Sequence, residues 1–414
     1  MHPLLYTLSS SLHSAIAPDP RTEAFIRDIE AALGESFECR GDDFSRYGAS
    51  PGPELIYVRT GGTEGLFLQQ VAPILPGRPG KGPAVRLLTS GRSNSLAASM
   101  EILSWLQRND LDGEILHGSP EDIATRIRTA PLTAAPNPPA VHPEPYSYGR
   151  ILDGKRFGVV GKPSDWLISS DVDYAVVREK LGAELIDIPI EELVEEVHEP
   201  GPENAQIQGI GLKPLNTPRY GRKISAADWH DALAIYGALR RLVDRYRLDG
   251  LTLRCFDLLS VLHNTGCLAL AILNTEGFTA TCEGDIPAML SMAAARAISG
   301  KASFQVNLSR IDGDRLLFAH CTVPLSIVRD YCYDTHFESG IGVAIHGELP
   351  EGPVTLFKLA PDCNRMLRLE ARLSANSYGD HLCRTQVIVE APGAAEYFLR
   401  TPIGNHHIIV PGKL

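Results

Sequence analysis

The residues best suited to chemistry in this chain are carboxylates and imidazoles that follow short hydrophobic runs. Residues 281–287 read TCEGDIP, so Glu283 and Asp285 flank a glycine where a predicted strand meets a predicted helix. Functional groups of open α/β sheets usually lie at such strand ends. Asp285 directly precedes the helix and suits its N-cap, whereas Glu283 has no such local structural use. We therefore expect Glu283 to be a functional residue.

Three histidines follow the same pattern. His320 ends the hydrophobic run 316–320, and His406 and His407 follow a Gly-Asn pair near the end of the sequence. A single histidine is usually a core or surface residue, but a carboxylate and imidazoles at the ends of separate strands suggest convergence on one centre. Carboxylate oxygen and imidazole nitrogen suit Mn²⁺ or another octahedral divalent ion better than they suit zinc, which favours thiolates.

Composition narrows the class of protein. The chain has 414 residues, of which 44% are hydrophobic, and its 39 Lys and Arg against 50 Asp and Glu give a net charge of −11. At about 150 residues per domain, two or three domains are expected. The acidic balance makes nucleic acid and anionic membranes poor partners, and no hydrophobic run approaches the ~20 residues of a membrane span. The eight cysteines form no Cys-x-x-Cys pair, so we expect buried thiols in a reducing, cytoplasmic compartment.

Two α/β domains and a β domain must position these groups. Residues 1–148 alternate strands near 55–58 and 84–88 with helical patterns, the clearest of which starts at Ser93 or Ser95. This alternation predicts a doubly wound parallel sheet. Residues 130–146 are rich in proline and predict a linker or a strap across the surface.

Residues 149–285 predict a second doubly wound domain, which carries Glu283 at its end. Strands are expected at 157–160, 184–188, 251–254 and 278–282, and helices at 171–181, 226–246 and from about 263. Residues 286–414 begin with a helix to about 298 and then turn to a mostly antiparallel, barrel-like β domain. Its strands are expected at 303–306, 316–321, 342–345, 354–359, 366–373, 385–389 and 407–410.

Turns at 61–63 and 161–164 end strands of the two α/β domains. The second turn reads GKPS, but it lacks the first glycine of a phosphate-binding loop and has proline after the lysine. Ligands collect at strand ends in this fold class. We therefore expect Asp165 and Trp166 to line the ligand site or its rim, with Trp166 as a core anchor the equal alternative.

Several short motifs, taken together, resemble the L-fucose/L-arabinose isomerase superfamily and its fucose-isomerase-like branch. They extend from about Tyr57 to His407, so the resemblance covers most of the chain. The motifs are residues 161–168 (GKPSDWLI), 254–259 (RCFDLL), 263–269 (HNTGCLA), 282–288 (CEGDIPA), 310–312 (RID), 319–321 (AHC), 333–342 (YDTHFESGIG) and 404–407 (GNHH).

The resemblance implies Mn²⁺-dependent interconversion of aldoses and ketoses through an enediol, in a trimeric or hexameric homo-oligomer that takes a small sugar. Glu283 matches the first metal-binding carboxylate, which also transfers protons. His406 or His407 matches the metal-binding histidine, and His320 a further one. Asp257, within the 254–259 motif, joins Asp165 and Trp166 as a candidate for binding the sugar.

One position departs from the family pattern. Asn307 stands where fucose isomerases carry a second catalytic and metal-binding aspartate. An amide can ligate through its oxygen but cannot accept a proton. Two hypotheses follow: an isomerase with Glu283 and Asn307 at the reaction centre, or a sugar-binding or regulatory relative with impaired turnover. An altered reaction on a sugar-like acid or polyol is a weaker third possibility, and Asp257 or Asp285 could supply the second carboxylate instead.

Overall fold

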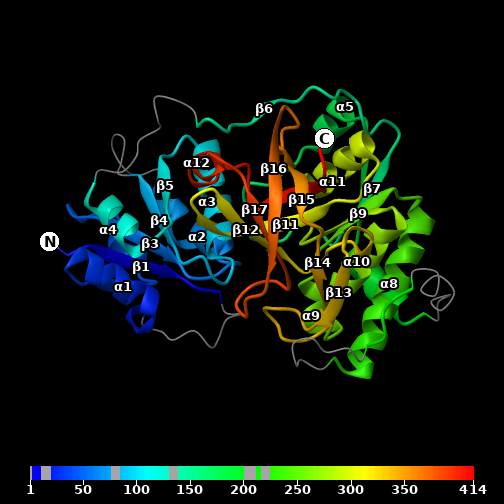
Figure 1. The fold of residues 1–414 in the computed structure, drawn as a ribbon, viewed down its shortest axis with the longest axis horizontal. Helices are drawn as coiled ribbons and strands as arrows, with labels where there is room; N and C mark the ends of the chain where they lie inside the picture. Colours follow the sequence, from blue (N-terminus) through cyan, green and yellow to red (C-terminus); the bar gives the residue numbers. More distant parts are fainter. Residues whose placement is uncertain (1, 11–19, 76–83, 130–138, 200–210, 216–223) are drawn as a thin grey trace.

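The computed structural model describes residues 2–10, 20–75, 84–129, 139–199, 211–215 and 224–414. Figure 1 shows a β-barrel, coloured yellow to red, between a first α/β unit at the left and a second at the right. The predicted class, two parallel α/β sheets and a closed antiparallel barrel in the C-terminal region, is confirmed. Most of the proline-rich segment, residues 130–138, lies outside the described residues.

The first unit is a five-stranded parallel sheet in the order β2-β1-β3-β4-β5. Leu5 and Leu55 face α1 and α4, while Leu4 and Ile56 face α2 and α3, so the strands are buried on both sides. From β1 the chain first moves to one edge of the sheet, to β2, and then to the other side, to β3, β4 and β5. The switch point is therefore between β1 and β3, and ligands of doubly wound sheets bind at such a point. The elements are β1 (Leu4–Leu8), α1 (Ala24–Leu33), β2 (Glu38–Gly41), β3 (Glu54–Val58), α2 (Glu64–Gln70), β4 (Val85–Thr89), α3 (Ser95–Arg108), β5 (Gly113–Leu116) and α4 (Pro120–Arg128).

The second unit is a four-stranded parallel sheet in the order β10-β9-β7-β8. Two of its long helices begin at polar caps: Ser225 accepts the Asp228 amide at the start of α8, and Asp285 accepts the Ala288 amide at the start of α11. The elements are β7 (Arg156–Val160), α5 (Tyr174–Lys180), β8 (Glu184–Ile188), α6 (Ile190–Val197), α8 (Ala226–Tyr246), β9 (Gly250–Leu253), α9 (Asp257–Val261), α10 (Cys267–Glu276), β10 (Thr279–Cys282) and α11 (Ile286–Ser299).

Six antiparallel strands close the barrel in the order β15-β18-β11-β12-β17-β16, because β16 also pairs with β15. The short strand β6 (Glu144–Pro145) adds to β16 from the inter-unit segment. The barrel elements are β11 (Phe304–Asp312), β12 (Arg315–His320), β15 (Gly352–Leu359), β16 (Arg365–Ser377), β17 (Thr385–Glu390), α12 (Ala394–Arg400) and β18 (His406–Pro411).

One predicted barrel strand lies elsewhere. Residues 342–345 were expected in the barrel, but β14 (Ala344–Glu348) pairs only with β13 (Asp330–Asp334) in a separate two-stranded ribbon. A short hydrophobic run shows that a segment is a buried strand, yet it does not show which sheet the strand joins.

Each barrel strand presents two faces that alternate along the chain. Val306 and Ile409 point into the barrel core, whereas Gln305 and Ile408 point outward. Ile408 packs beneath α11 on that outer face, and Gln305 accepts a hydrogen bond from the Cys282 amide at 2.8 Å. The outer wall at β11 and β18 is therefore fastened to the carboxyl edge of the second sheet.

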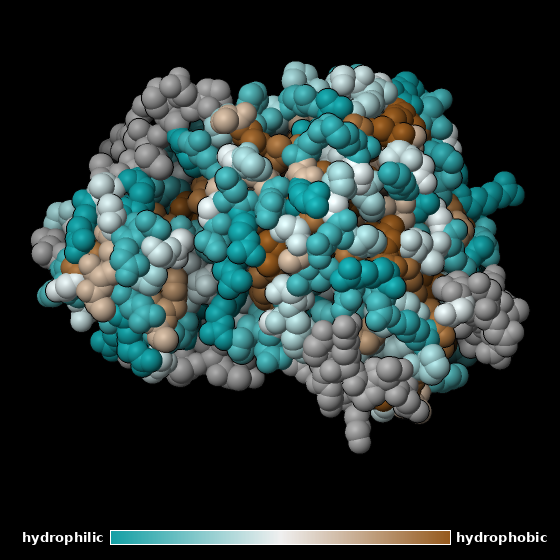
Figure 2. Space-filling view, viewed as in Figure 1, coloured by the Kyte–Doolittle hydropathy of each residue, from teal (hydrophilic) through white to brown (hydrophobic). Residues whose placement is uncertain are grey.

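Hydrophilic side chains cover much of the face drawn in Figure 2, and hydrophobic ones show between them over the barrel and the second unit. In the parts of the chain that the structure describes, no helix combines the length and hydrophobicity needed to cross a bilayer.

Candidate metal centre and pocket

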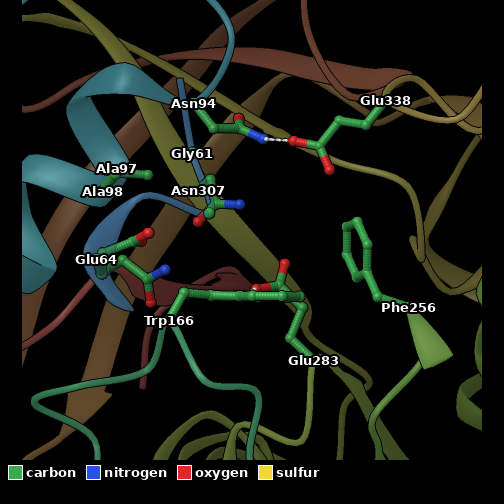
Figure 3. A pocket seen from close by; sticks show the side chains of 12 residues that line it. Gly61, Glu64, Asn94, Ala97, Ala98, Trp166, Phe256, Glu283, Asn307 and Glu338 are labelled. Carbon is green, nitrogen blue, oxygen red and sulfur yellow. Dashed lines mark hydrogen bonds between the residues drawn. The ribbon is translucent and has the colours of Figure 1, made fainter. Parts of the chain in front are cut away.

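A pocket lies where the two α/β units meet the outer wall of the barrel (Figure 3). The first unit contributes residues from the end of β3 and the start of α3, and the second unit residues from the ends of β9 and β10. The lining residues are Gly61, Gly62, Glu64, Asn94, Ala97, Ala98, Trp166, Phe256, Glu283, Asn307, Glu338 and Asn405. Both carboxyl edges at which polar groups were expected thus open onto the same space.

Glu283, His320 and His406 form a buried group beside this pocket. Their potential ligand atoms all lie within 4.8 Å of one another. The Glu283 Oε1 atom is 3.3 Å from Nε2 of His406 and 3.7 Å from Nε2 of His320. The three residues come from the end of β10, the last position of β12 and the first position of β18. One carboxylate and two imidazoles in this arrangement could hold a metal ion.

The backbone at Glu283 is in a conformation that non-glycine residues rarely adopt. Its φ is +66°, and that of Gly284 is +68°. A Cβ on Gly284 would lie 2.4 Å from the carbonyl oxygen of Lys162, so only glycine fits at this position. The amide of Ser164 donates to the Glu283 carbonyl at 3.0 Å and helps to hold the turn. Such strain costs about 1–3 kcal/mol and is concentrated at functional sites.

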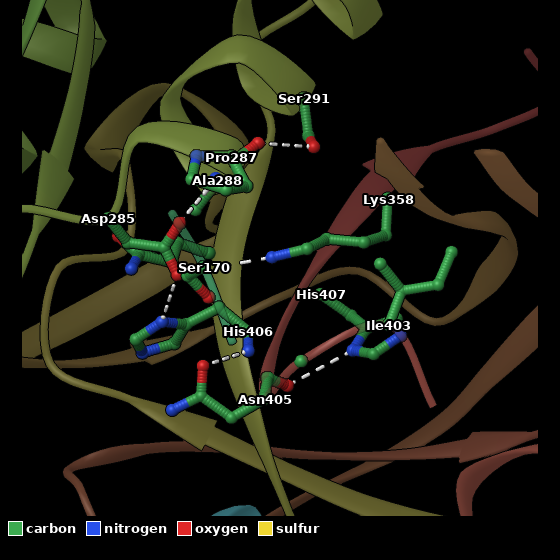
Figure 4. A network of polar contacts seen from close by, with 12 residues as sticks. Ser170, Asp285, Pro287, Ala288, Ser291, Lys358, Ile403, Asn405, His406 and His407 are labelled. Carbon is green, nitrogen blue, oxygen red and sulfur yellow. Dashed lines mark hydrogen bonds and ion pairs between the residues drawn. The ribbon is translucent and has the colours of Figure 1, made fainter. Parts of the chain in front are cut away.

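Asp285 orients His406 from behind (Figure 4). Its Oδ2 atom accepts from Nδ1 of His406 at 2.8 Å, while Oδ1 accepts the Ala288 amide at 2.6 Å. Lys358, 1% exposed, places its ammonium 3.9 Å from the same carboxylate. Because Nδ1 is engaged, Nε2 faces the Glu283 side, and it makes no hydrogen bond there. This carboxylate–histidine arrangement is the usual outer support of a metal-binding imidazole.

Electrostatics favour a charged form of this group. Burial raises the pKa of Glu283, but His406 and His320 outweigh that effect and hold the pKa well below its usual range. Burial lowers the pKa of His406, but Glu283 and Asp285 raise it to about 10. In the absence of a cation, the two carboxylates therefore keep a proton on His406.

Asn307 lies beside the group on the same wall. It pairs directly with His406 across β11 and β18, so the two side chains leave the sheet on the same face. Its side chain is 4% exposed, and its Oδ1 atom has no hydrogen-bond partner. A buried amide oxygen without a partner is an acceptor that an ion or a ligand could use.

His407 lies outside the group. It is on the opposite face of β18, where Nδ1 donates to the Asn405 carbonyl at 3.1 Å and Nε2 accepts from the Tyr397 hydroxyl at 2.9 Å. Burial lowers its pKa to about 3, so the ring is neutral. With both nitrogens engaged, His407 has the environment of a structural core histidine.

Of the residues expected to bind substrate, Trp166 lines the pocket and the two aspartates do not. The Trp166 Nε1 atom donates to Oε2 of Glu283 at 2.6 Å, and its ring packs edge-on against Phe256 at 4.9 Å between centroids. Asp165 and Asp257 instead flank Arg254, at 2.7 and 3.0 Å, and the Asp165 side chain is 73% exposed. These ion pairs fasten the turn after β7 to the end of β9.

Two pocket carboxyl groups were missed by the sequence reasoning. Glu64 is 1% exposed, and its Oε2 atom has no partner. Glu338 accepts from Nδ2 of Asn94 at 2.9 Å, which joins the β13–β14 loop to the first unit. Their only sequence signals were the turn just before Glu64 and the 333–342 motif around Glu338.

A scan against protein-family models found no matching family, and a search of curated proteins found no matching relative.

Proposed function

We propose that this protein is an aldose–ketose isomerase of the L-fucose/L-arabinose type, acting with a divalent cation, Mn²⁺ in the first instance. The observation that carries the proposal is the buried Glu283–His320–His406 group, beside which Asn307 presents an unpaired amide oxygen to the same pocket. The residues present fit a cation. Asn307 Oδ1 is a buried acceptor without a hydrogen bond. His406 Nε2 becomes a free ligand atom once a cation displaces its proton, and oxygen and imidazole donors suit Mn²⁺.

When bound, the cation would supply a positive charge for the oxygens of the developing enediolate. The chain's own residues contribute the rest. Glu283 is ionised and can accept a proton from carbon, and the Trp166 hydrogen bond orients its second oxygen. Asp285 fixes the orientation of the His406 ring. Side chains of all three units surround these groups in the pocket.

The lining supports an uncharged sugar as the substrate. It offers amide and carboxyl groups that bind hydroxyls, and among the described residues no lysine or arginine lines the pocket. A phosphorylated or carboxylated sugar would meet Glu64, Glu283 and Glu338 with no cationic side chain to receive it.

Asn307 supports a second candidate, a sugar-binding or regulatory relative without efficient turnover. The amide removes one negative charge from the site, which weakens cation binding, and it cannot act as a base. In this alternative the pocket binds sugar but forms no ketose.

The test starts from protein stripped with a chelator and titrated calorimetrically with Mn²⁺, followed by a panel of aldoses assayed for ketose. We expect one buried Mn²⁺ site, lost in His406→Gln and kept in His230→Gln, an exposed histidine of α8. Ketose formation supports the isomerase, and sugar binding without ketose supports the alternative. Absence of Mn²⁺ binding contradicts the isomerase, and absence of both Mn²⁺ and sugar binding contradicts both candidates.

We also propose a homo-oligomer, a trimer or hexamer, on the basis of the resemblance alone; sedimentation velocity tests it. A cytoplasmic location is supported by the buried free thiols among the described residues, such as Cys255 and Cys282.

A further inference from the structure

The pocket contains more carboxyl groups than a metal centre needs. Besides Glu283, both Glu64 and Glu338 line it, although the position with the expected second carboxylate holds Asn307. Neither Glu64 nor Glu338 belongs to the group that could hold a metal ion. A carboxyl group placed in a pocket without a cationic partner is costly to bury as an anion, so these two groups call for an explanation.

Glu338 is placed to meet a ligand. Its loop follows β13, and the hydrogen bond from Asn94 holds one carboxyl oxygen. In Figure 3 the carboxyl group lies across the open space from Trp166 and Glu283, on the same side as Phe256. A molecule in this space would have Glu283 on one side and Glu338 on the other.

The proton affinities of the two extra carboxyl groups differ. Burial, reinforced by the charge of Glu283, raises the pKa of Glu338 to about 8. Glu338 is partly exposed and can both give and take a proton near neutrality. Burial raises the pKa of the fully enclosed Glu64 well above its usual range. Glu64 therefore stays neutral and suits hydrogen bonding to a hydroxyl rather than proton transfer.

We propose that Glu338 is the second proton-transfer residue of this site and supplies the function that Asn307 lacks. This inference rests on the isomerase function proposed above. Glu283 moves a proton between C2 and C1 of the sugar, and Glu338 moves a proton between O1 and O2.

The electrons balance without any other reactant. Glu283 takes the C2 hydrogen as a proton, and the C2–H electron pair becomes the C1=C2 double bond. The carbonyl electron pair moves to O1, which takes the proton of Glu338, giving the enediol. In the second half, Glu338 takes the O2 proton, the C2=O2 double bond forms, and the displaced double-bond pair takes the proton of Glu283 at C1.

The main test is Glu338→Gln, which keeps the acceptor for Asn94 and the side-chain volume but cannot transfer a proton. The matched control is Glu351→Gln, an exposed glutamate of the same domain. We expect Glu338→Gln to lower kcat for ketose formation by 10²–10⁴-fold, with KM, Mn²⁺ affinity and sugar affinity changed less than about threefold. Asn307→Asp should restore part of the lost kcat, because it returns a carboxylate to the pocket.

A second readout needs neither metal nor substrate. In the metal-free protein, infrared difference spectra between pH 6 and pH 10 should show a carboxyl group that titrates in wild type and is missing in Glu338→Gln. Full turnover in Glu338→Gln, or an unchanged infrared titration, overturns the inference while the isomerase function stands. Wild-type protein that forms no ketose and exchanges no sugar C–H with solvent deuterium overturns the proposed function, and this inference with it.

Discussion

Asp285→Asn tests whether the carboxylate behind His406 prepares the site for a cation. Asp285 has two acceptor oxygens, both in use: one for the Ala288 amide and one for Nδ1 of His406. Asparagine offers one oxygen and one NH₂ group, so it can satisfy only one of these donors. If the oxygen stays with Ala288, the NH₂ group faces Nδ1 and drives the ring proton to Nε2, where a metal must bind.

The size of the effect follows from this choice. Losing the outer carboxylate of a metal-binding histidine costs about 10–100-fold in metal affinity, or about 1.4–2.7 kcal/mol. If the asparagine oxygen instead faces Nδ1 of His406, the ring keeps its tautomer but the Ala288 amide loses its cap, which lowers the free energy of unfolding by about 1 kcal/mol. The buried ammonium of Lys358 also loses the carboxylate that lies 3.9 Å away, so the variant is less stable.

Calorimetric titration of chelator-treated protein with Mn²⁺ is the assay, with thermal unfolding measured alongside. Asp173→Asn is the matched control, because Asp173 caps α5 through the Ala175 amide but is exposed and does not belong to the metal-binding group. Asp285→Asn combined with Lys358→Met should recover stability but not affinity. If Asp285→Asn binds Mn²⁺ within a factor of two of wild type, Asp285 does not set the tautomer of His406.

Three further changes test other parts of the argument. Asn307→Asp should tighten Mn²⁺ binding and raise kcat at least ~10-fold, about 1.4 kcal/mol of barrier; unchanged affinity and turnover would mean that Asn307 is only a strand residue. Gly284→Ala should lower the free energy of unfolding by more than about 2 kcal/mol, because a Cβ meets the Lys162 carbonyl at 2.4 Å. Gly313→Ala, also left-handed but with open space around it, should cost only about 1 kcal/mol in the same urea titration. Burial and Arg310 lower the pKa of His117 to about 4, whereas this histidine has a pKa near 6.5 in the unfolded chain. As the pH falls from about 6.5 to about 4, the unfolded chain takes up the proton first, so the free energy of unfolding should fall by up to about 3 kcal/mol. His117→Gln should flatten this dependence, measured by urea titration at pH 7.5 and pH 5.

The positions that sequence patterns located well are those at the ends of hydrophobic strands. Glu283, His320 and His406 each terminate or begin such a run, and the structure brings all three together. Parallel strands with buried faces and capped helices leave clear local patterns, so the two α/β sheets could also be predicted.

Contacts between residues far apart in the sequence determine the parts of the site that local sequence patterns did not predict. The choice between His406 and His407 depends on which face of β18 meets Asn307, and that register is a property of two distant strands. Glu338 lies in a loop without periodicity, and its place in the pocket depends on a hydrogen bond from Asn94 of the first unit. Asp165 and Asp257 are carboxylates that could bind a sugar, but Arg254 forms ion pairs with both of them outside the pocket. The spacing of residues in the sequence does not show which ion pairs will form.

The accumulation of buried acids at this junction argues for function on energetic grounds. Glu64, Glu101, Glu283 and Asp285 are all nearly inaccessible, and burying carboxylates opposes folding unless something compensates the charge. Glu101 is explained locally, because it accepts the amides of Ser169 and Asn405 and so ties the three units together. Glu283 accepts a hydrogen bond from Trp166 and lies beside His406 and His320, but it also adds a strained φ to the cost of burial. A strained carboxylate buried between two histidines is costly to the fold, and this cost is the physical argument for a ligand at this place.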